Sequence, residues 1–200
     1  MIIRASAEHI KKAGDYPEAK FILEETDRLN KIVTDYLGIA GGRRILQIGD
    51  VELKEFLQQI VEQFSQRLKS DGIDLNFSPP SERIITCADP SALHQVLINL
   101  ILNAADAVRG KEKVQIELSA GIDGKSCRII VDDNGPGIPS EDLKHIFEPF
   151  YTTKTSGSGL GLFLSKKLVT EMKGEISVQS KTGGPTRFII VLPSAEIKDA

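Results

Sequence analysis

Two asparagines stand four positions apart in an otherwise apolar stretch, HQVLINLILNAADA, where they could bind a metal ion and phosphate. A helix over residues 90–108 would place Asn99 and Asn103 on one face. Asparagine is a poor helix former that prefers caps, so two of them in such a helix need a reason beyond propensity. The amide oxygen of Asn103 suits Mg²⁺, which keeps several waters and is completed by substrate phosphates. The alternative is a pair of satisfied core amides.

An acidic glycine turn, DDNGPGIP at 132–139, follows an apolar run typical of a strand. In it, Asp133, Gly135 and Gly137 form the pattern D-x-G-x-G. The glycines let the backbone pass close beneath a flat ring, and a buried carboxylate beside them can accept a hydrogen bond from the exocyclic amine of adenine. The same carboxylate would repel the carbonyl oxygen of guanine and so reject GTP. The alternative is an ordinary turn with Asp133 in solvent.

The segment FEPFYTTK at 147–154 precedes a loop rich in Gly, Ser and Thr, a composition suited to a lid that opens and closes over a ligand. We expect Phe147 and Phe150 to pin the base of this lid to the core. Lys154 stands where its charge could reach phosphate oxygens. The alternative for Lys154 is a solvated surface lysine.

Three glycines, Gly157, Gly159 and Gly161, open a predicted helix over 159–172 in GSGLGLFLSKKL. Helix N-termini bind phosphate through free N–H groups and the helix dipole. Leu160 lies in this loop and is expected to help anchor it. No G-K-[ST] follows, which excludes a Walker A loop, and no strand immediately precedes the glycines, which excludes a Rossmann fingerprint.

Together these motifs resemble the GHKL ATP-binding superfamily, in the version found in sensor histidine kinases of the nitrogen-regulation type. The resemblance implies ATP and Mg²⁺ as cofactors, with Asn103 as the metal ligand and with Asn99, Asn103 and Lys154 as the catalytic residues. It also implies that Thr186, in the family's last glycine box, supports Asp133 through its hydroxyl. The implied nucleotide-binding residues are Asn99, Asn103, Asp133, Gly135, Gly137, Lys154, Gly157, Gly159, Leu160, Gly161 and Thr186.

One position separates the two branches of this superfamily. The branch that hydrolyses ATP, which includes type II topoisomerases, chaperones and mismatch-repair proteins, carries a general-base Glu four residues before the metal-binding Asn. This sequence has Asn99 there, and an amide cannot take a proton. Activation of water from this helix is therefore disfavoured, and transfer to a supplied nucleophile is favoured.

The elements that must position these motifs alternate between strands and helices, and several strand pairs read as hairpins. Asp89 and Pro90 are an N-cap and first-turn proline for the helix over 90–108, and Asp50 is expected to cap a helix that ends near residue 70. Interleaved hairpins favour an α+β fold: a two-layer α/β sandwich, the GHKL or Bergerat ATP-binding fold, with a mixed sheet and helices on one face. The predicted strands are 45–48, 73–77, 84–87, 114–120, 127–132, 175–180 and 187–192, and a short helix is predicted over 141–146.

Residues 1–42 read as part of an α-helical hairpin, and residues 43–197 as the catalytic ATP-binding domain. Alternating spacings of four and three form the heptad seam of a bundled helix, through Ile22, Thr26, Leu29, Val33, Tyr36 and Ala40. The resemblance implies that the hairpin forms a homodimer and carries a phosphoacceptor histidine. Since His9 lacks the expected flanking residues, the acceptor box is expected upstream of Met1.

Composition narrows the choice of partners. A formal net charge of −3 and a pI near 5.7 argue against nucleic-acid binding, which needs a basic patch. Cys87 and Cys127 lie in apolar runs without a C-x-x-C motif, so both are expected to be reduced core residues. Asn99 and Asn103 interrupt the longest apolar run, so no membrane segment is expected in this chain. The chain is expected to be cytoplasmic.

The resulting functional prediction is a protein-histidine kinase that transfers the γ-phosphoryl group of Mg-ATP to a histidine and thence to the receiver domain of a response regulator. Two alternatives stay open. One is an ATP-binding regulatory module without phosphotransfer, and the other is a GHKL serine kinase of the anti-sigma type.

Overall fold

The computed structural model describes residues 45–109, 114–154 and 157–195, together with Tyr16, Glu18, Ala19, Ile22, Leu23 and Thr26. The predicted hairpin over residues 1–42, its heptad seam and His9 therefore lie almost wholly outside the described residues.

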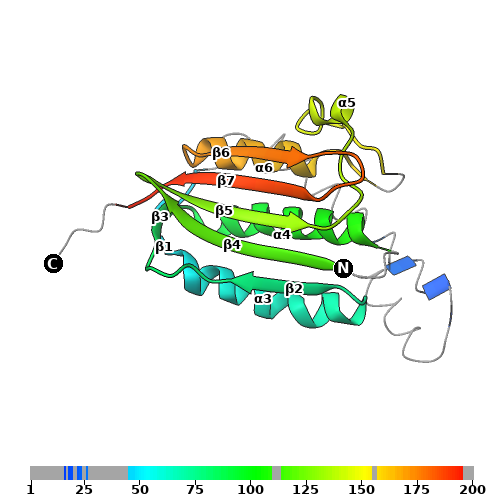
Figure 1. The fold of residues 1–200 in the computed structure, drawn as a ribbon, viewed down its shortest axis with the longest axis horizontal. Helices are drawn as coiled ribbons and strands as arrows, with labels where there is room; N and C mark the ends of the chain where they lie inside the picture. Colours follow the sequence, from blue (N-terminus) through cyan, green and yellow to red (C-terminus); the bar gives the residue numbers. More distant parts are fainter. Residues whose placement is uncertain are drawn as a thin grey trace.

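In the described part of the chain, one sheet of five strands organises the domain (Figure 1). Its order is β2-β4-β5-β7-β6; β2 pairs with β4 in parallel, and the other neighbours are antiparallel. The sheet is therefore mixed, as predicted. The strands are β2 (Asp74–Ser78), β4 (Gln115–Asp123), β5 (Ser126–Asp133), β6 (Glu175–Ser180) and β7 (Thr186–Pro193).

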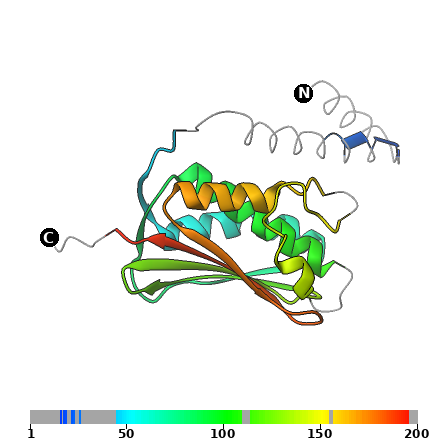
Figure 2. The same ribbon diagram turned by 90° about the horizontal axis from the view of Figure 1, so that it is seen from above.

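Three helices cover one face of this sheet: α3 (Leu53–Ser70), α4 (Pro90–Val108) and α6 (Gly161–Glu171). Figure 2 shows them in a single layer against the sheet, which confirms the predicted two-layer α+β arrangement. Helix α4 supplies much of the core through Ala92, Leu93, Val96, Leu97, Leu100, Ile101, Ala104, Ala105 and Val108. Among the described residues, α4 is also the one helix long and apolar enough to cross a membrane by length and composition. Here it is packed inside the domain.

A second, two-stranded sheet pairs β1 (Gly49–Glu52) with β3 (Ile85–Ala88) in antiparallel register. The strand predicted over 45–48 is therefore displaced, and the prediction that Asp50 caps the next helix is wrong. Asp50 pairs with Cys87 inside β1, so the chain is still extended there. The carboxylate of Glu52 caps α3 instead, accepting from the backbone N–H of Lys54 at 3.0 Å.

The predicted cap of α4 is confirmed. Oδ1 of Asp89 accepts a hydrogen bond from the backbone N–H of Ala92 at 2.9 Å. Its other oxygen accepts from the N–H of Gln47 at 2.7 Å. Asp89 therefore joins the segment before β1 to the helix that carries both asparagines.

The remaining boundaries differ from the sequence prediction for local reasons. Helix α6 begins at Gly161 rather than at Gly159, because Gly159 has a φ of +68°, which a right-handed helix cannot contain. Helix α5 is only Ser140–Leu143, shorter than the predicted 141–146. Both thiols are free; Cys127 is buried, which raises its pKa, whereas Cys87 is only partly buried.

Candidate functional site

A cavity of about 460 Å³ opens between α4, the start of α6, the turn after β5 and the segment before α6. Most of the predicted site residues line it: Asn99, Asn103, Asp133, Gly137, Lys154, Gly157, Gly159, Gly161 and Thr186. Gly135 and Leu160 are not among its lining residues. Leu160 is instead a buried apolar residue immediately before α6, which suits its predicted role as an anchor.

At the end of β5, Asp133 is a buried acid with 4% of its surface exposed. Its Oδ1 accepts a hydrogen bond from the backbone N–H of Gly135 at 2.8 Å. A Cβ on residue 135 would lie 2.5 Å from that same oxygen. Gly135 therefore contributes to the site indirectly: a side chain at position 135 would displace the Asp133 carboxylate from its orientation.

The turn after Asp133 is fastened to the end of the sheet. Gly137 has a φ of +76°, and a Cβ there would overlap the backbone oxygen of Lys181. The hydroxyl of Ser180 accepts from the N–H of Ile138 at 2.9 Å and lies 3.0 Å from the hydroxyl of Thr186. Strand register places Thr186 directly opposite Asp133. Ser180 was not predicted, since a serine at a strand end carries no distinctive signal.

Apolar side chains make up much of the remaining wall. They come from the turn after β5, the segment after α5, the first turn of α6 and strand β7, and they are Ile138, Ile146, Leu162 and Phe188. Apolar walls around a buried carboxylate are typical of a site for a flat, partly polar ring. The arrangement suits adenine, with Asp133 as the acceptor.

The opposite part of the cavity is polar. The side-chain amide of Asn99 donates to the hydroxyl of Ser165 at 3.0 Å, and that hydroxyl donates to the carbonyl of Gly161 at 3.0 Å. A Cβ on Gly161 would overlap the side-chain amide of Asn99, whose Cγ would lie only 3.0 Å from it and whose oxygen would lie closer still. This close approach brings Asn99 beside the first turn of α6, where backbone N–H groups have no partner within the helix.

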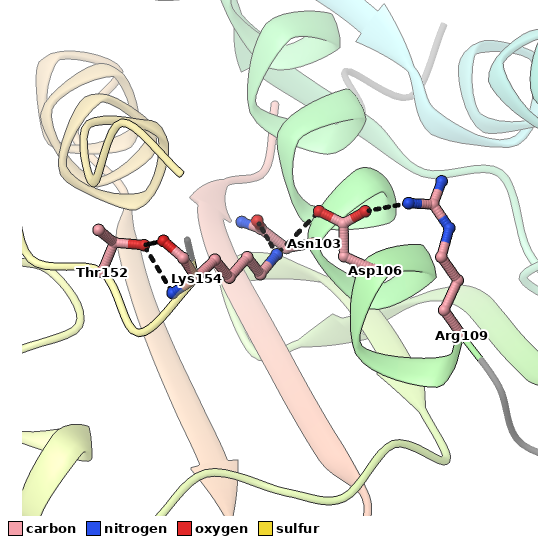
Figure 3. A network of polar contacts seen from close by, with 5 residues as sticks. All are labelled: Asn103, Asp106, Arg109, Thr152 and Lys154. Atoms are coloured by element: carbon pink, nitrogen blue, oxygen red, sulfur yellow. Dashed lines mark hydrogen bonds and ion pairs between the residues drawn. The ribbon is translucent and has the colours of Figure 1, made fainter. Parts of the chain in front are cut away.

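Lys154 bridges from the segment before α6 to helix α4 (Figure 3). Its ammonium donates to the amide oxygen of Asn103 at 3.2 Å and to the carboxylate of Asp106 at 2.9 Å. Asp106 also lies 3.5 Å from the guanidinium of Arg109. Lys154 is thus a partly exposed lysine that is engaged with two acceptors on α4. Asp106 was missed, although its position three residues after Asn103 places it on the same helical face.

The ammonium group of Lys154 lies at the amide oxygen of Asn103. This oxygen therefore faces the cavity and can interact with a cation there. Within the described ranges, no group of three or more His, Cys, Asp or Glu side chains could hold a metal ion. The amide oxygen of Asn103 is a ligand of the kind that Mg²⁺ accepts together with water and nucleotide phosphates.

The base of the predicted lid is held differently from the prediction. Phe147 packs against the core as expected, but Phe150 is 67% exposed, so its predicted anchoring role is wrong. Phe150 also has a positive φ of +66°, which is unusual for a residue other than glycine. Tyr151 is held instead, because its hydroxyl donates to Asp142, and this hydrogen bond raises the pKa of Tyr151. Tyr151 and Asp142 both line the cavity and were not predicted.

Comparison with known proteins identifies the family of this chain. The sequence profile described as "Histidine kinase-, DNA gyrase B-, and HSP90-like ATPase" matches residues 88–196. Sensor histidine kinase ZraS of Escherichia coli (strain K12) is 35% identical over 175 residues, which are 88% of this chain and 37% of ZraS. This chain thus spans well under half of that relative.

Two solved structures have the same fold. Full-length ShkA in complex with AMPPNP matches 96% of this chain and 42% of its own, with a TM-score of 0.78 and 29% identity. Histidine kinase ThkA, in complex with the response regulator protein TrrA, matches 99% of this chain and 58% of its own, with a TM-score of 0.75 and 30% identity. The chain therefore belongs to the histidine kinase-, DNA gyrase B- and HSP90-like ATPase family, and its described domain is a catalytic domain of the histidine kinase type.

Proposed function

We propose that this chain is the catalytic region of a sensor histidine kinase in a two-component system. It binds Mg-ATP, and the γ-phosphoryl group passes to a histidine on a helical hairpin and then to an aspartate of a response regulator. The observation that carries this proposal is the amide of Asn99, which stands beside Gly161 in the polar part of the cavity, where a hydrolase of this family would need a base.

The two parts of the cavity match the two parts of ATP. Asp133 accepts from the adenine amine at the apolar part, oriented by its bond from Gly135, with Thr186 opposite it in the strand register. The triphosphate faces Asn99, Lys154 and the first turn of α6. The complex of ShkA with AMPPNP supports a nucleotide with three phosphate groups in this family of domains.

Mg²⁺, when bound, would neutralise phosphate charge and hold the triphosphate in one conformation. Asn103 is the residue that would hold it, through the oxygen that now accepts from Lys154. Lys154 adds a positive charge, and the N-terminus of α6 adds backbone N–H donors. Phosphoryl transfer needs little beyond such positioning and charge stabilisation from the protein.

Hydrolysis of ATP is disfavoured by the way the cavity's acidic and amide groups are engaged. The Asn99 amide donates to Ser165 and cannot remove a proton from water. Asp142 accepts from Tyr151. We therefore propose that the nucleophile comes from outside the cavity, as a histidine on a hairpin would.

The described histidines do not compete for that role. His94 lies on α4 with its ring nitrogen 3.2 Å from the side chain of Gln63, and His145 lies 3.0 Å from the carboxylate of Glu148. Neither lines the cavity. We assign the acceptor to a hairpin helix, as the resemblance to sensor histidine kinases implies.

The proposal extends to partners and location. Residues 1–42 form part of the dimerising hairpin and residues 43–197 the catalytic domain, in a cytoplasmic part of the sensor. The complex of ThkA with TrrA supports a receiver domain as the partner that takes the phosphoryl group.

The test is incubation of the chain with Mg²⁺ and γ-labelled ATP, alone and with a purified acceptor-bearing hairpin of a histidine kinase. An acid-labile, base-stable label on the hairpin histidine is expected, and D133N should need a higher ATP concentration to reach the same labelling. Bound ATP without transfer would support a regulatory module instead. Acid-stable label on serine or threonine of an added protein would support a serine kinase.

A further inference from the structure

We propose that Asp106 is a positioning residue that, with Asn103, holds Lys154 in the nucleotide-free protein and gives it up when Mg-nucleotide binds. The inference deepens the proposed function and rests on it for the nucleotide-bound half only. It concerns the lid segment, defined here as residues 150–154.

The contact is made by two oxygen acceptors from successive turns of α4. Lys154 Nζ lies 2.9 Å from Asp106 Oδ2 and 3.2 Å from Asn103 Oδ1, and all three residues line the cavity. Figure 3 shows the lysine side chain reaching across from the lid segment to the helix. The lid segment is thereby tied to α4 at its far end, while Tyr151 ties its near end to Asp142.

Neighbouring groups orient both partners. Arg109 lies 3.5 Å from the second carboxylate oxygen of Asp106 and 3.9 Å from Asp71, at the end of α3. The hydroxyl of Thr152 accepts from the backbone N–H of Lys154 at 3.1 Å. Arg109 therefore orients the Asp106 carboxylate from the side opposite Lys154. The Thr152 hydroxyl orients the backbone of Lys154 within the lid segment.

The amide oxygen of Asn103 is the reason that this contact must be temporary. The same oxygen is the proposed Mg²⁺ ligand, and a metal ion there would face the Lys154 ammonium at close range. Two cations cannot share that position without strong repulsion. Lys154 must leave Asn103 as Mg-nucleotide enters, and the phosphate oxygens then offer it a stronger acceptor than one carboxylate.

The pairing with Asp106 thus stabilises the nucleotide-free state and opposes binding. Because the Lys154 and Asp106 side chains are 39% and 43% exposed, the effect is that of a surface ion pair. D106N should therefore tighten the binding of Mg-AMPPNP by about two- to fivefold, and the gain should shrink at high salt.

The first experiment needs no ligand. Hydrogen exchange of backbone amides at residues 151–154 is measured in the nucleotide-free wild type, D106N, K154M and D71N. Exchange should be about two- to fivefold faster in D106N and K154M. It should be unchanged in D71N, which removes an acid that contacts Arg109 but shows no contact with Lys154. Unchanged exchange in D106N, with an unchanged melting temperature, would overturn the inference that Asp106 holds Lys154.

The second experiment is a double-mutant cycle by calorimetry with Mg-AMPPNP. The gain from D106N should vanish in the K154M background, because Asp106 acts through the lysine. An equal gain in both backgrounds would mean that Asp106 merely repels phosphate. Weaker binding by D106N would mean that Asp106 supports the metal, and either result would overturn the inference. If the wild type does not bind AMPPNP, the proposed function fails, while the exchange experiment still decides the nucleotide-free contact.

Discussion

Replacing Asp133 with asparagine tests the adenine-binding end of the cavity with the smallest change in shape. The carboxylate is 4% exposed, and Oδ1 accepts from the N–H of Gly135 at 2.8 Å. In D133N the amide oxygen can keep that bond, which leaves the NH₂ group in place of the other carboxylate oxygen. A donor then faces the donating amine of adenine.

The size of the effect follows from this geometry. The variant loses one hydrogen bond to a charged acceptor in a buried site and gains a donor–donor contact, together about 1–3 kcal/mol. The dissociation constant for ATP should rise about ten- to a hundredfold. Guanine has a carbonyl where adenine has its amine, so the affinity for GTP should fall less than the affinity for ATP. The preference for ATP over GTP should therefore shrink.

The assay is calorimetry with Mg-AMPPNP and a GTP analogue, with D132N as a matched control. Asp132 is the neighbouring residue on the other face of β5, where its carboxylate pairs with Arg187 at 2.7 Å. D132N should leave nucleotide affinity unchanged. An unchanged ATP affinity in a folded D133N protein would refute the assignment of Asp133.

Three further variants test other parts of the site. N103A should keep the melting temperature but remove the Mg²⁺ dependence of nucleotide binding, measured by titration with and without EDTA; a binding curve that still responds to Mg²⁺ would make Asn103 a structural amide. G137A should destabilise the domain in urea by at least about 1–2 kcal/mol, because φ is +76° and a Cβ would overlap the Lys181 oxygen; unchanged stability would contradict this. Y151F should alter stability against pH. Asp142 raises the pKa of Tyr151 above its ordinary 10.0, so the phenol contributes stability below pH 10 and loses it as pH rises further. Unfolding curves of Y151F should lack that alkaline loss.

Local sequence was enough to predict much of the fold, because several signals act over only a few residues. Asp89 followed by Pro90 predicted the start of α4, and its carboxylate does cap that helix. The strands predicted over 114–120 and 127–132 correspond to β4 and β5, which pair as a hairpin whose turn contains Gly124 at a φ of +61°. Asp50 was misread as a helix cap, because the pairing of β1 with β3 is not visible in the local sequence.

For the site, the sequence by itself determined which residue types would meet: two amides on one helical face, an acid before a glycine turn, and glycines opening a helix. These follow from periodicity and from backbone conformations that only certain residues adopt. Tertiary structure alone decided the pairings. Lys154 and Asp106 are 48 positions apart and meet only because the lid segment crosses α4. Ser180, Ile138 and Thr186 come together only because the β6–β7 end packs on the glycine turn. Phe150 and Tyr151 are adjacent aromatics, and only the fold shows that Tyr151 lines the cavity, with its hydroxyl on Asp142, while Phe150 is exposed.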